Sequence, residues 1–264
     1  MSMAPESALE IPPPQPLEMR WRRAFRSMRE LFDNSDDTEK AMDFFYAIGR
    51  REFERSFQRF LASPEGRGRT LLRERPDLGR ALADRQALAA MPEGSFGRAY
   101  LAFLERYGFQ SMALLQLQKQ VEAKWDAEEG VPRLDPARAW FRDRVMLSHD
   151  LFHVLTGYGT DDIGEATLLA FTLGQVPGRG QALLTIGAAL EVARALGRPW
   201  LRYDLRAWRR GRRAVRLAGV PWEALLPLPL DEVRKRLRIT PAREAHPGGI
   251  LAGTIDNYRV IAPA

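Results

Sequence analysis

The sequence contains no cysteine and only three histidines among its 264 residues. Without thiols the chain can form no disulfide, no thiolate nucleophile and none of the cysteine-rich sites that hold structural zinc. No stretch reaches the roughly 18 uninterrupted apolar residues of a membrane span, so we expect a chain that does not cross a bilayer. Alternating apolar and polar runs of useful length are missing too, which argues against β-strands.

Most of the chain instead shows helical periodicity. Apolar residues recur at three- and four-residue steps, most clearly at Phe44, Ile48, Phe53, Phe57 and Phe60. With 45% hydrophobic and 28% charged residues, the composition is typical of a soluble globular domain. We predict an all-α fold with one multi-helix domain over residues 31–264, and helices over 41–61, 69–90, 94–107, 109–125, 136–156, 161–175, 179–196, 201–217 and 230–237.

The N-terminal residues have a different composition. Residues 1–17 are rich in proline and have no apolar core typical of a signal peptide, so we expect a flexible arm over residues 1–30. Glu6 and Glu10 argue against a mitochondrial presequence, which is poor in acidic residues. The expected location is a bacterial cytoplasm.

Two of the three histidines form the most informative motif. His149 and His153 are four residues apart, and Glu165 follows twelve residues later. On one helix, at about 100° per residue, the side chains of His149, Asp150 and His153 project within one sector. Gly157 can end this helix, and a second helix from about residue 161 would bring Glu165 back toward the histidines.

Imidazole nitrogens combined with carboxylate oxygens suit zinc, or another borderline divalent ion, better than calcium or magnesium. We therefore predict a Zn²⁺ site between two helices, with His149, Asp150, His153 and Glu165 as ligands. The alternative is an ordinary helix face, because two histidines at this spacing are not specific on their own. Asp150 occupies the place where zinc proteases carry a glutamate, so peptidase activity is not expected.

The pattern His-Asp-x-x-His, eleven residues and Glu resembles the signature of the Coq-four family of coenzyme Q (ubiquinone) biosynthesis proteins. Residues 68–76 and 91–100 upstream, and 220–223 and 230–237 downstream, resemble further segments of that family. The resemblance covers roughly residues 35–240. Two departures flank the ligands: Leu151-Phe152 replaces a more aromatic pair, and Leu147-Ser148 replaces an arginine-valine pair.

The resemblance implies a ubiquinone biosynthesis protein that acts on a polyprenylated quinone precursor. The family is linked to loss of the ring carboxyl group, with oxygen taking its place. This implies a carboxy-lyase acting on a polyprenylated hydroxybenzoate-type ring, with His149, Asp150, His153 and Glu165 at its catalytic metal. Zinc does not change oxidation state, so an oxidative reaction needs a redox metal or a ring that reacts directly with oxygen.

Proton transfer would fall to Tyr158, Asp161 or Asp162, unless these are loop and cap residues. Apolar stretches at 168–173 and 183–190 would line a tunnel for the isoprenoid tail, or else form ordinary core. The alternative function is a non-catalytic isoprenoid-lipid-binding scaffold that presents intermediates to other quinone biosynthesis proteins.

The formal charge of +6 is concentrated in residues 198–216. Of the eight arginines in this range, seven alternate with Trp200, Tyr203, Trp208 and aliphatic residues, namely Arg202, Arg206, Arg209, Arg210, Arg212, Arg213 and Arg216. Such a helix predicts peripheral contact with the anionic inner membrane, and the alternative is a solvated basic face. No nucleic-acid-binding module accompanies it, so nucleic acid is not an expected partner. A homodimer is expected as the commonest assembly.

Overall fold

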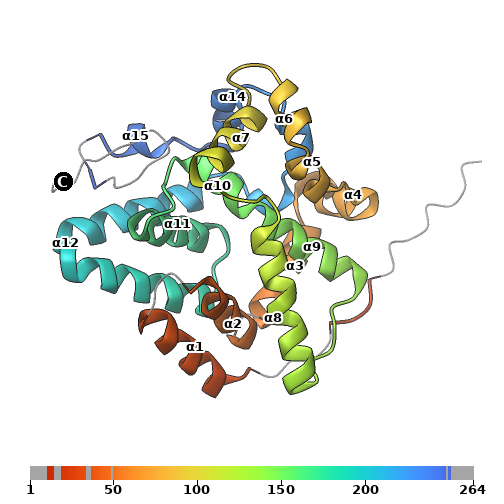
Figure 1. The fold of residues 1–264 in the computed structure, drawn as a ribbon, viewed down its shortest axis with the longest axis vertical. Helices are drawn as coiled ribbons and strands as arrows, with labels where there is room; N and C mark the ends of the chain where they lie inside the picture. Colours follow the sequence, from red (N-terminus) through yellow and green to blue (C-terminus); the bar gives the residue numbers. More distant parts are fainter. Residues whose placement is uncertain (1–10, 15–18, 34–36, 49, 248, 251–264) are drawn as a thin grey trace, which may run out of the picture.

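The computed structural model describes residues 11–14, 19–33, 37–48, 50–247 and 249–250. These residues form α-helices and short 3₁₀ turns and contain no strand, with a single isolated bridge between Ser95 and Pro229. The helices are α1 (Trp21–Asp33), α2 (Thr38–Ile48), α3 (Arg50–Leu61), α4 (Arg67–Glu74), α5 (Leu78–Ala83), α6 (Arg85–Ala90), α7 (Phe96–Tyr107), α8 (Ala113–Glu129), α9 (Pro136–Leu147), α10 (His149–Thr156), α11 (Asp162–Gln175), α12 (Arg179–Arg213), α13 (Trp222–Leu225), α14 (Leu230–Leu237) and α15 (Ala242–Ala245). The predicted all-α class is confirmed (Figure 1). No described helix combines the length and apolarity that a transmembrane segment needs.

Several predicted helices are divided in the structure by local caps. The segment predicted as one helix over 69–90 forms α4, α5 and α6, because Pro76 cannot continue a helix and Asp77 and Asp84 each accept a capping bond from a backbone N–H. The segment over 136–156 divides at Ser148, whose hydroxyl donates to the Arg144 carbonyl at 2.7 Å. These local side-chain bonds are not visible in apolar periodicity.

The N-terminal boundary also differs in detail. Helix α1 begins at Trp21, within the segment expected to be a flexible arm, and crosses the proposed boundary at residue 30. It forms because Ala24, Ser27 and Leu31 lie on one buried face against α2. Residues 1–10 and 15–18 of the expected arm lie outside the described residues.

Helix α12 is bent, and its two arms enclose α11. The bend is at Gly197, whose φ of 67° and ψ of −153° are not helical, two residues before Pro199. The first arm reaches α11 through Thr185 Oγ1, which lies 3.3 Å from the Leu169 carbonyl, and the second through the Gly211 carbonyl, which accepts from Gln175 at 2.5 Å. The predicted break between 196 and 201 is thus confirmed, and Figure 1 shows α11 inside the bend.

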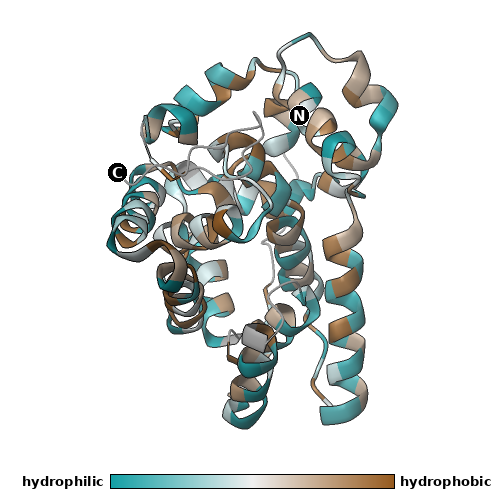
Figure 2. Ribbon diagram, turned by 60° about the vertical axis from the view of Figure 1, so that its left-hand side comes forward, coloured by the Kyte–Doolittle hydropathy of each residue, from teal (hydrophilic) through white to brown (hydrophobic). Residues whose placement is uncertain are grey.

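Three groups of buried apolar side chains hold the helices together. The largest joins α7, α10, α11, α14 and the second arm of α12, and it includes the fully buried Trp200 and Trp222. Smaller groups lie between α1, α2 and α8 and between α3, α4 and α9. Figure 2 shows the resulting alternation of apolar and polar faces along the helices. Helices α10 and α11, which carry the predicted ligands, therefore belong to the largest core.

Candidate metal site

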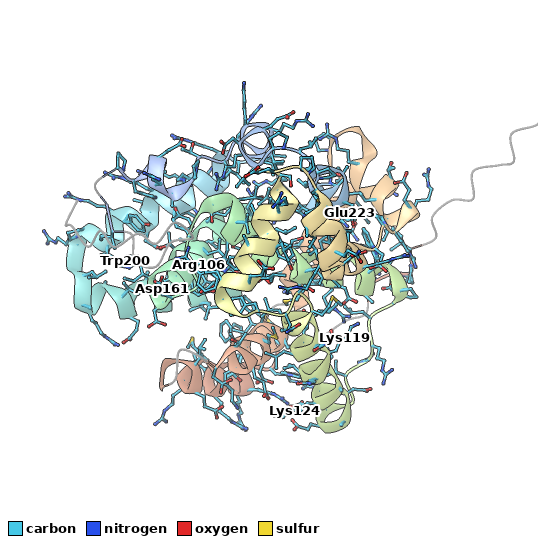
Figure 3. The ribbon with its side chains drawn as sticks, turned by 45° about the horizontal axis from the view of Figure 1, so that its top comes forward. Arg106, Lys119, Lys124, Asp161, Trp200 and Glu223 are labelled. Atoms are coloured by element: carbon cyan, nitrogen blue, oxygen red, sulfur yellow. The ribbon has the colours of Figure 1, made fainter. Side chains whose placement is uncertain are left out.

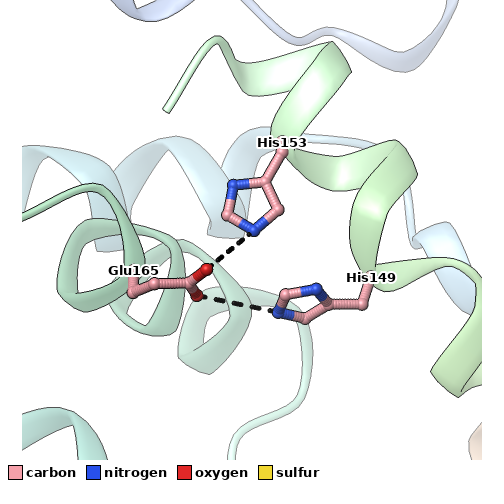
Figure 4. A group of neighbouring side chains, drawn as sticks. All are labelled: His149, His153 and Glu165. Carbon is pink, nitrogen blue, oxygen red and sulfur yellow. Dashed lines mark ion pairs between the residues drawn. The ribbon is translucent and has the colours of Figure 1, made fainter. Parts of the chain in front are cut away.

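His149 and His153 on α10 face Glu165 on the neighbouring α11 (Figure 4). His153 Nε2 lies 3.2 Å from Glu165 Oε1, and His149 Nε2 lies 3.8 Å from Glu165 Oε2. One ligand atom from each residue lies within 4.8 Å of the other two. Two ligands bound about 2.1 Å from a tetrahedral zinc ion are about 3.4 Å apart, so these separations fit one shared ion.

The surroundings of His153 leave one of its nitrogens free to bind. The side chain is 1% exposed, and its ring stacks on Phe103 with centroids 5.7 Å apart. Nδ1 lies 3.1 Å from the Tyr158 carbonyl oxygen, which only accepts, so Nδ1 carries the proton. Nε2 has a lone pair when the ring is neutral, and it faces Glu165 Oε1 at 3.2 Å, where a proton or a cation can lie between the two atoms. A buried nitrogen in this state fits a metal ligand.

Asp150 takes a different position from the one predicted. Its carboxylate Oδ1 lies 3.3 Å from His149 Nδ1, on the side of the ring away from the Nε2 that faces Glu165. The structure thus brings three of the four predicted ligands together and places the fourth beside one of them. A carboxylate behind a histidine ligand is the usual outer partner of a metal-bound imidazole. Direct ligation by Asp150 stays a prediction.

His153 and Glu165 shift each other's pKa. Burial alone would lower the pKa of His153, but the Glu165 carboxylate outweighs it and raises that pKa. Burial alone would raise the pKa of Glu165, but attraction by His153 and then His149 lowers it. Glu165 is therefore an anion at neutral pH. A divalent cation held by these residues would favour the same ionised state of Glu165.

Caps at both ends of the intervening loop fix the spacing of the ligands. Gly157, with a φ of 74°, ends α10 and returns its N–H to the His153 carbonyl at 2.8 Å. Asp161, labelled in Figure 3, is the N-cap of α11. Its Oδ1 accepts from the backbone N–H groups of Ile163 and Gly164. Glu165 consequently lies in the first turn of α11, opposite the histidines.

These contacts redefine the candidates for proton transfer. The Tyr158 hydroxyl bonds to Arg210 and to His246, so it is engaged in the core behind the site. Asp161 acts as an N-cap. These contacts favour the alternative that Tyr158 and Asp161 are structural residues. Phe103, Arg210 and His246 were not predicted at the site, because only tertiary packing brings them near α10.

A cavity of about 490 Å³ is lined by Ser148 and Phe152, the sequence neighbours of His149 and His153, but by none of the three candidate ligands. Its lining is mainly apolar and includes Phe53, Phe141, Val145 and Phe152. His149 follows Val145 by about one helical turn, and the lining residue Thr172 follows Glu165 by about two turns on the same face of α11. The cavity volume is within the range of small-molecule sites.

The stretches expected to line a tunnel take other positions. Leu168, Ala170 and Phe171 are buried in the core, and Thr172 reaches the cavity. Leu183, Ile186 and Leu190 instead face outward, with 39%, 55% and 56% exposure.

The arginines of residues 198–216 do not share one environment. Arg210 contacts Tyr158 and the Thr240 carbonyl inside the protein, and Arg216 donates to the Gly174 and Gln175 carbonyls at the end of α11. Arg202, Arg206, Arg209 and Arg213 are exposed on α12, as are Leu201 and Leu205. The expected basic face therefore excludes Arg210.

Comparison with known proteins agrees with the motif. Residues 43–118 and 131–243 match the model of the family Coenzyme Q (ubiquinone) biosynthesis protein Coq4, the Coq-four family. Ubiquinone biosynthesis protein COQ4, mitochondrial, of Coprinopsis cinerea is 30% identical over 70% of this chain and 59% of its own length. The COQ4 homolog 1 of Culex quinquefasciatus is 30% identical over 69% of the chain and 60% of its own. The chain thus spans less than two thirds of these relatives.

A solved structure shares the fold. The crystal structure of a protein from Nostoc punctiforme PCC 73102, described as a ubiquinone biosynthesis protein, aligns with a TM-score of 0.58 at 20% identity. The alignment covers 83% of this chain and 98% of the other. With the family match over most of its length, the chain belongs to the Coq4 family of coenzyme Q (ubiquinone) biosynthesis proteins.

Proposed function

We propose that the chain acts in ubiquinone biosynthesis as a zinc-dependent decarboxylase of a polyprenylated hydroxybenzoate-type ring. One observation carries the proposal: the buried Nε2 of His153, the Nε2 of His149 and the Glu165 carboxylate converge, with one ligand atom from each residue within 4.8 Å of the other two. Metal binding would account for the convergence of these side chains. A prenylated ring would suit the mainly apolar cavity that Phe152, the neighbour of His153, lines. Another divalent metal could take the place of zinc.

The chemistry assigned to the site is a proton-for-carboxyl exchange. The bond between the ring carbon and the carboxylate breaks, carbon dioxide leaves, and the electron pair left on the ring carbon takes up a proton. When bound, the metal supplies Lewis-acid stabilisation of the negative charge that develops on the substrate. His149 is 38% exposed, so the site borders solvent, from which the proton can come. Replacement of the carboxyl group by oxygen would need dioxygen as a further reactant.

The cavity is proposed to hold the isoprenoid tail. The tail would run from the metal group along Val145 and Phe152 of α9 and α10 and past Thr172 of α11. Burying an isoprenoid chain in this lining is favourable by about 25 cal/mol for each Å² of apolar surface removed from water.

The cavity also favours a second candidate, a non-catalytic scaffold. A protein that only carries prenylated intermediates to other quinone biosynthesis proteins needs the cavity but no turnover at the metal. Engagement of the Tyr158 hydroxyl with Arg210 and His246 favours this candidate, since that hydroxyl is not available to move a proton at the metal group.

We further propose peripheral contact with the bacterial inner membrane from its cytoplasmic side. The exposed arginines on the second arm of α12 lie beside exposed Leu201 and Leu205, which is the composition of an interfacial helix. Such contact would place the cavity near its hydrophobic substrate. We also propose, as expected from the sequence, that the protein forms a homodimer.

A complementation experiment separates enzyme from scaffold. A host that lacks its own ring decarboxylation step receives the parent chain, Glu165→Ala, or the control Glu191→Ala, whose side chain is exposed on α12. We expect quinone synthesis with the parent and the control, and none with Glu165→Ala, which should remain folded and lipid-bound. Full synthesis with the metal-free Glu165→Ala protein would favour the scaffold.

A further inference from the structure

The third histidine, His246, lies in a buried cluster directly behind the metal group. Its side chain is 1% exposed, and Nε2 lies 3.1 Å from the Tyr158 hydroxyl and 3.3 Å from Arg210 Nη1. The Tyr203 ring packs on the imidazole with centroids 4.1 Å apart. These residues come from the 157–161 loop, the second arm of α12 and the segment after α15.

The direction of the hydrogen bonds follows from the chemistry of the groups. Arginine can only donate, so the Tyr158 hydroxyl accepts from Arg210 and has its own proton to donate to His246 Nε2. His246 is therefore a neutral acceptor at this nitrogen. Burial, with the positive charges of Arg210 and Arg206, lowers the pKa of His246 to about 3, which agrees with the neutral form.

The other end of Tyr158 touches the metal group. Its backbone carbonyl accepts from His153 Nδ1 at 3.1 Å and thereby leaves Nε2 free for a metal. Tyr158 lies between two glycines, and its backbone N–H donates to Thr156 Oγ1 at 3.4 Å. Its position depends on the ring, which is 1% exposed, and on the hydroxyl. Arg210 is fixed in turn by its bond to the Thr240 carbonyl.

We propose that Arg210, Tyr158 and His246 form a positioning cluster that sets the tautomer and orientation of His153 for metal binding. The cluster holds the Tyr158 hydroxyl at one end, which keeps the Tyr158 carbonyl against His153 Nδ1 at the other. Residues far apart in the sequence thus support one ligand. The inference rests on the proposed metal site, but its first effect, on the His153 tautomer, occurs without metal.

Paired variants test this role. Tyr158→Phe removes the hydroxyl and keeps the ring, His246→Leu removes the acceptor, and His246→Gln retains an acceptor oxygen. Tyr203→Phe is the matched control, because it deletes a hydroxyl in the same cluster that forms no hydrogen bond to Tyr158 among the described residues. Zn²⁺ affinity is measured by competition with a chelator, and circular dichroism checks that each variant keeps its helices.

We expect Tyr158→Phe and His246→Leu to bind Zn²⁺ about 10- to 100-fold more weakly than the parent, as outer-partner substitutions do. His246→Gln and Tyr203→Phe should stay within about threefold of the parent. Affinities of Tyr158→Phe and His246→Leu equal to that of the control would overturn the proposal.

Nitrogen NMR of the metal-free protein supplies a readout that needs no metal. At a pH well above the raised pKa of His153, where its imidazole has become neutral, His153 should be a single Nδ1–H tautomer in the parent and a mixture of tautomers in Tyr158→Phe. An unchanged single tautomer in that variant would also overturn the proposal. If the parent itself binds no Zn²⁺, the metal proposal fails, while the tautomer measurement still decides the positioning role.

Discussion

Glu165 Oε1 lies 3.2 Å from His153 Nε2, a nitrogen that can hold either a proton or a metal ion toward this carboxylate. Its partner ring nitrogen already carries the proton that the Tyr158 carbonyl accepts. In the neutral ring the facing atoms are a lone pair and an anionic oxygen, which repel each other. Without a metal, a second proton on Nε2 relieves this repulsion, and Glu165 accordingly raises the pKa of His153. A divalent cation also accounts for His149, whose Nε2 faces the other oxygen of Glu165 at 3.8 Å.

Replacing His153 with alanine should remove most metal binding. The side chain supplies a buried ligand, so we expect the Zn²⁺ affinity of His153→Ala to fall by at least about 100-fold. Most helical signal should survive, because the apolar core involves many other residues. Elemental analysis after dialysis and far-UV circular dichroism measure the two effects. Full metal occupancy in the His149→Ala, His153→Ala double variant would refute the assignment.

Substitution of Asp150 distinguishes a ligand from an outer partner. Asp150 lies on the Nδ1 side of His149, so Asp150→Asn should keep the metal in place and weaken its affinity by about 10- to 100-fold. Cobalt substitution provides the measurement, because its visible spectrum reports the number and kind of ligands. An unchanged cobalt spectrum with weaker affinity fits the outer position. A spectrum that shows loss of one oxygen ligand would instead support the original prediction that Asp150 ligates directly.

Asp204 should make the protein less stable as the pH rises. Burial raises the pKa of this carboxyl to about 7, and Oδ1 has no partner among the described residues. Between about pH 4 and 7 the folded state keeps a proton that the unfolded state has lost, so the free energy of unfolding falls with rising pH. Asp204→Asn has no such loss and should be more stable at pH 8 by an amount on the order of 2 kcal/mol.

Urea unfolding at pH 5 and pH 8 measures this difference. The control is Asp231→Asn, whose carboxylate is 93% exposed and which should change stability little at either pH. A stability difference between Asp204→Asn and the parent that does not grow from pH 5 to pH 8 would contradict the prediction.

Membrane contact should depend on the exposed arginines alone. At roughly 1 kcal/mol each near an anionic surface, changing Arg202, Arg206, Arg209 and Arg213 to glutamine should abolish most binding to vesicles that contain anionic lipid. The control changes four exposed arginines on other helices, Arg55, Arg69, Arg80 and Arg98, so both proteins have the same net charge. Co-sedimentation with the vesicles at low salt measures the binding of each protein. Equal loss in both variants would show a general charge effect and no membrane-binding face.

Helix content and the main break in α12 could be predicted from the sequence because periodicity and glycine-proline signals are local. The division of the 69–90 segment could not, although Asp77 and Asp84 were visible as possible caps, since a cap is decided by where the flanking apolar residues find partners. Helix α1 was missed for a similar reason. Its buried face is small, and that face is buried only because α1 packs against α2.

The site was predictable as far as helix geometry extends. His149 and His153 share one helix and Glu165 begins the next, so their meeting follows from spacing and a short loop. The position of Asp150 depends on rotamers about a helix, which the spacing leaves open. The roles of Arg210 and His246 depend on contacts across 36 to 88 residues of chain, and no local pattern encodes those.

The most direct test of the central claim follows the carboxyl carbon itself. Purified zinc-loaded protein in anionic vesicles receives a prenylated hydroxybenzoate labelled with ¹³C at the ring carboxyl, and released ¹³CO₂ is measured together with the lipid that remains bound. The parent is predicted to release label over repeated turnovers, and Glu165→Gln to bind the lipid without releasing it. If the zinc-loaded parent binds the lipid but releases no label, the result would contradict the decarboxylase proposal and support the scaffold proposal.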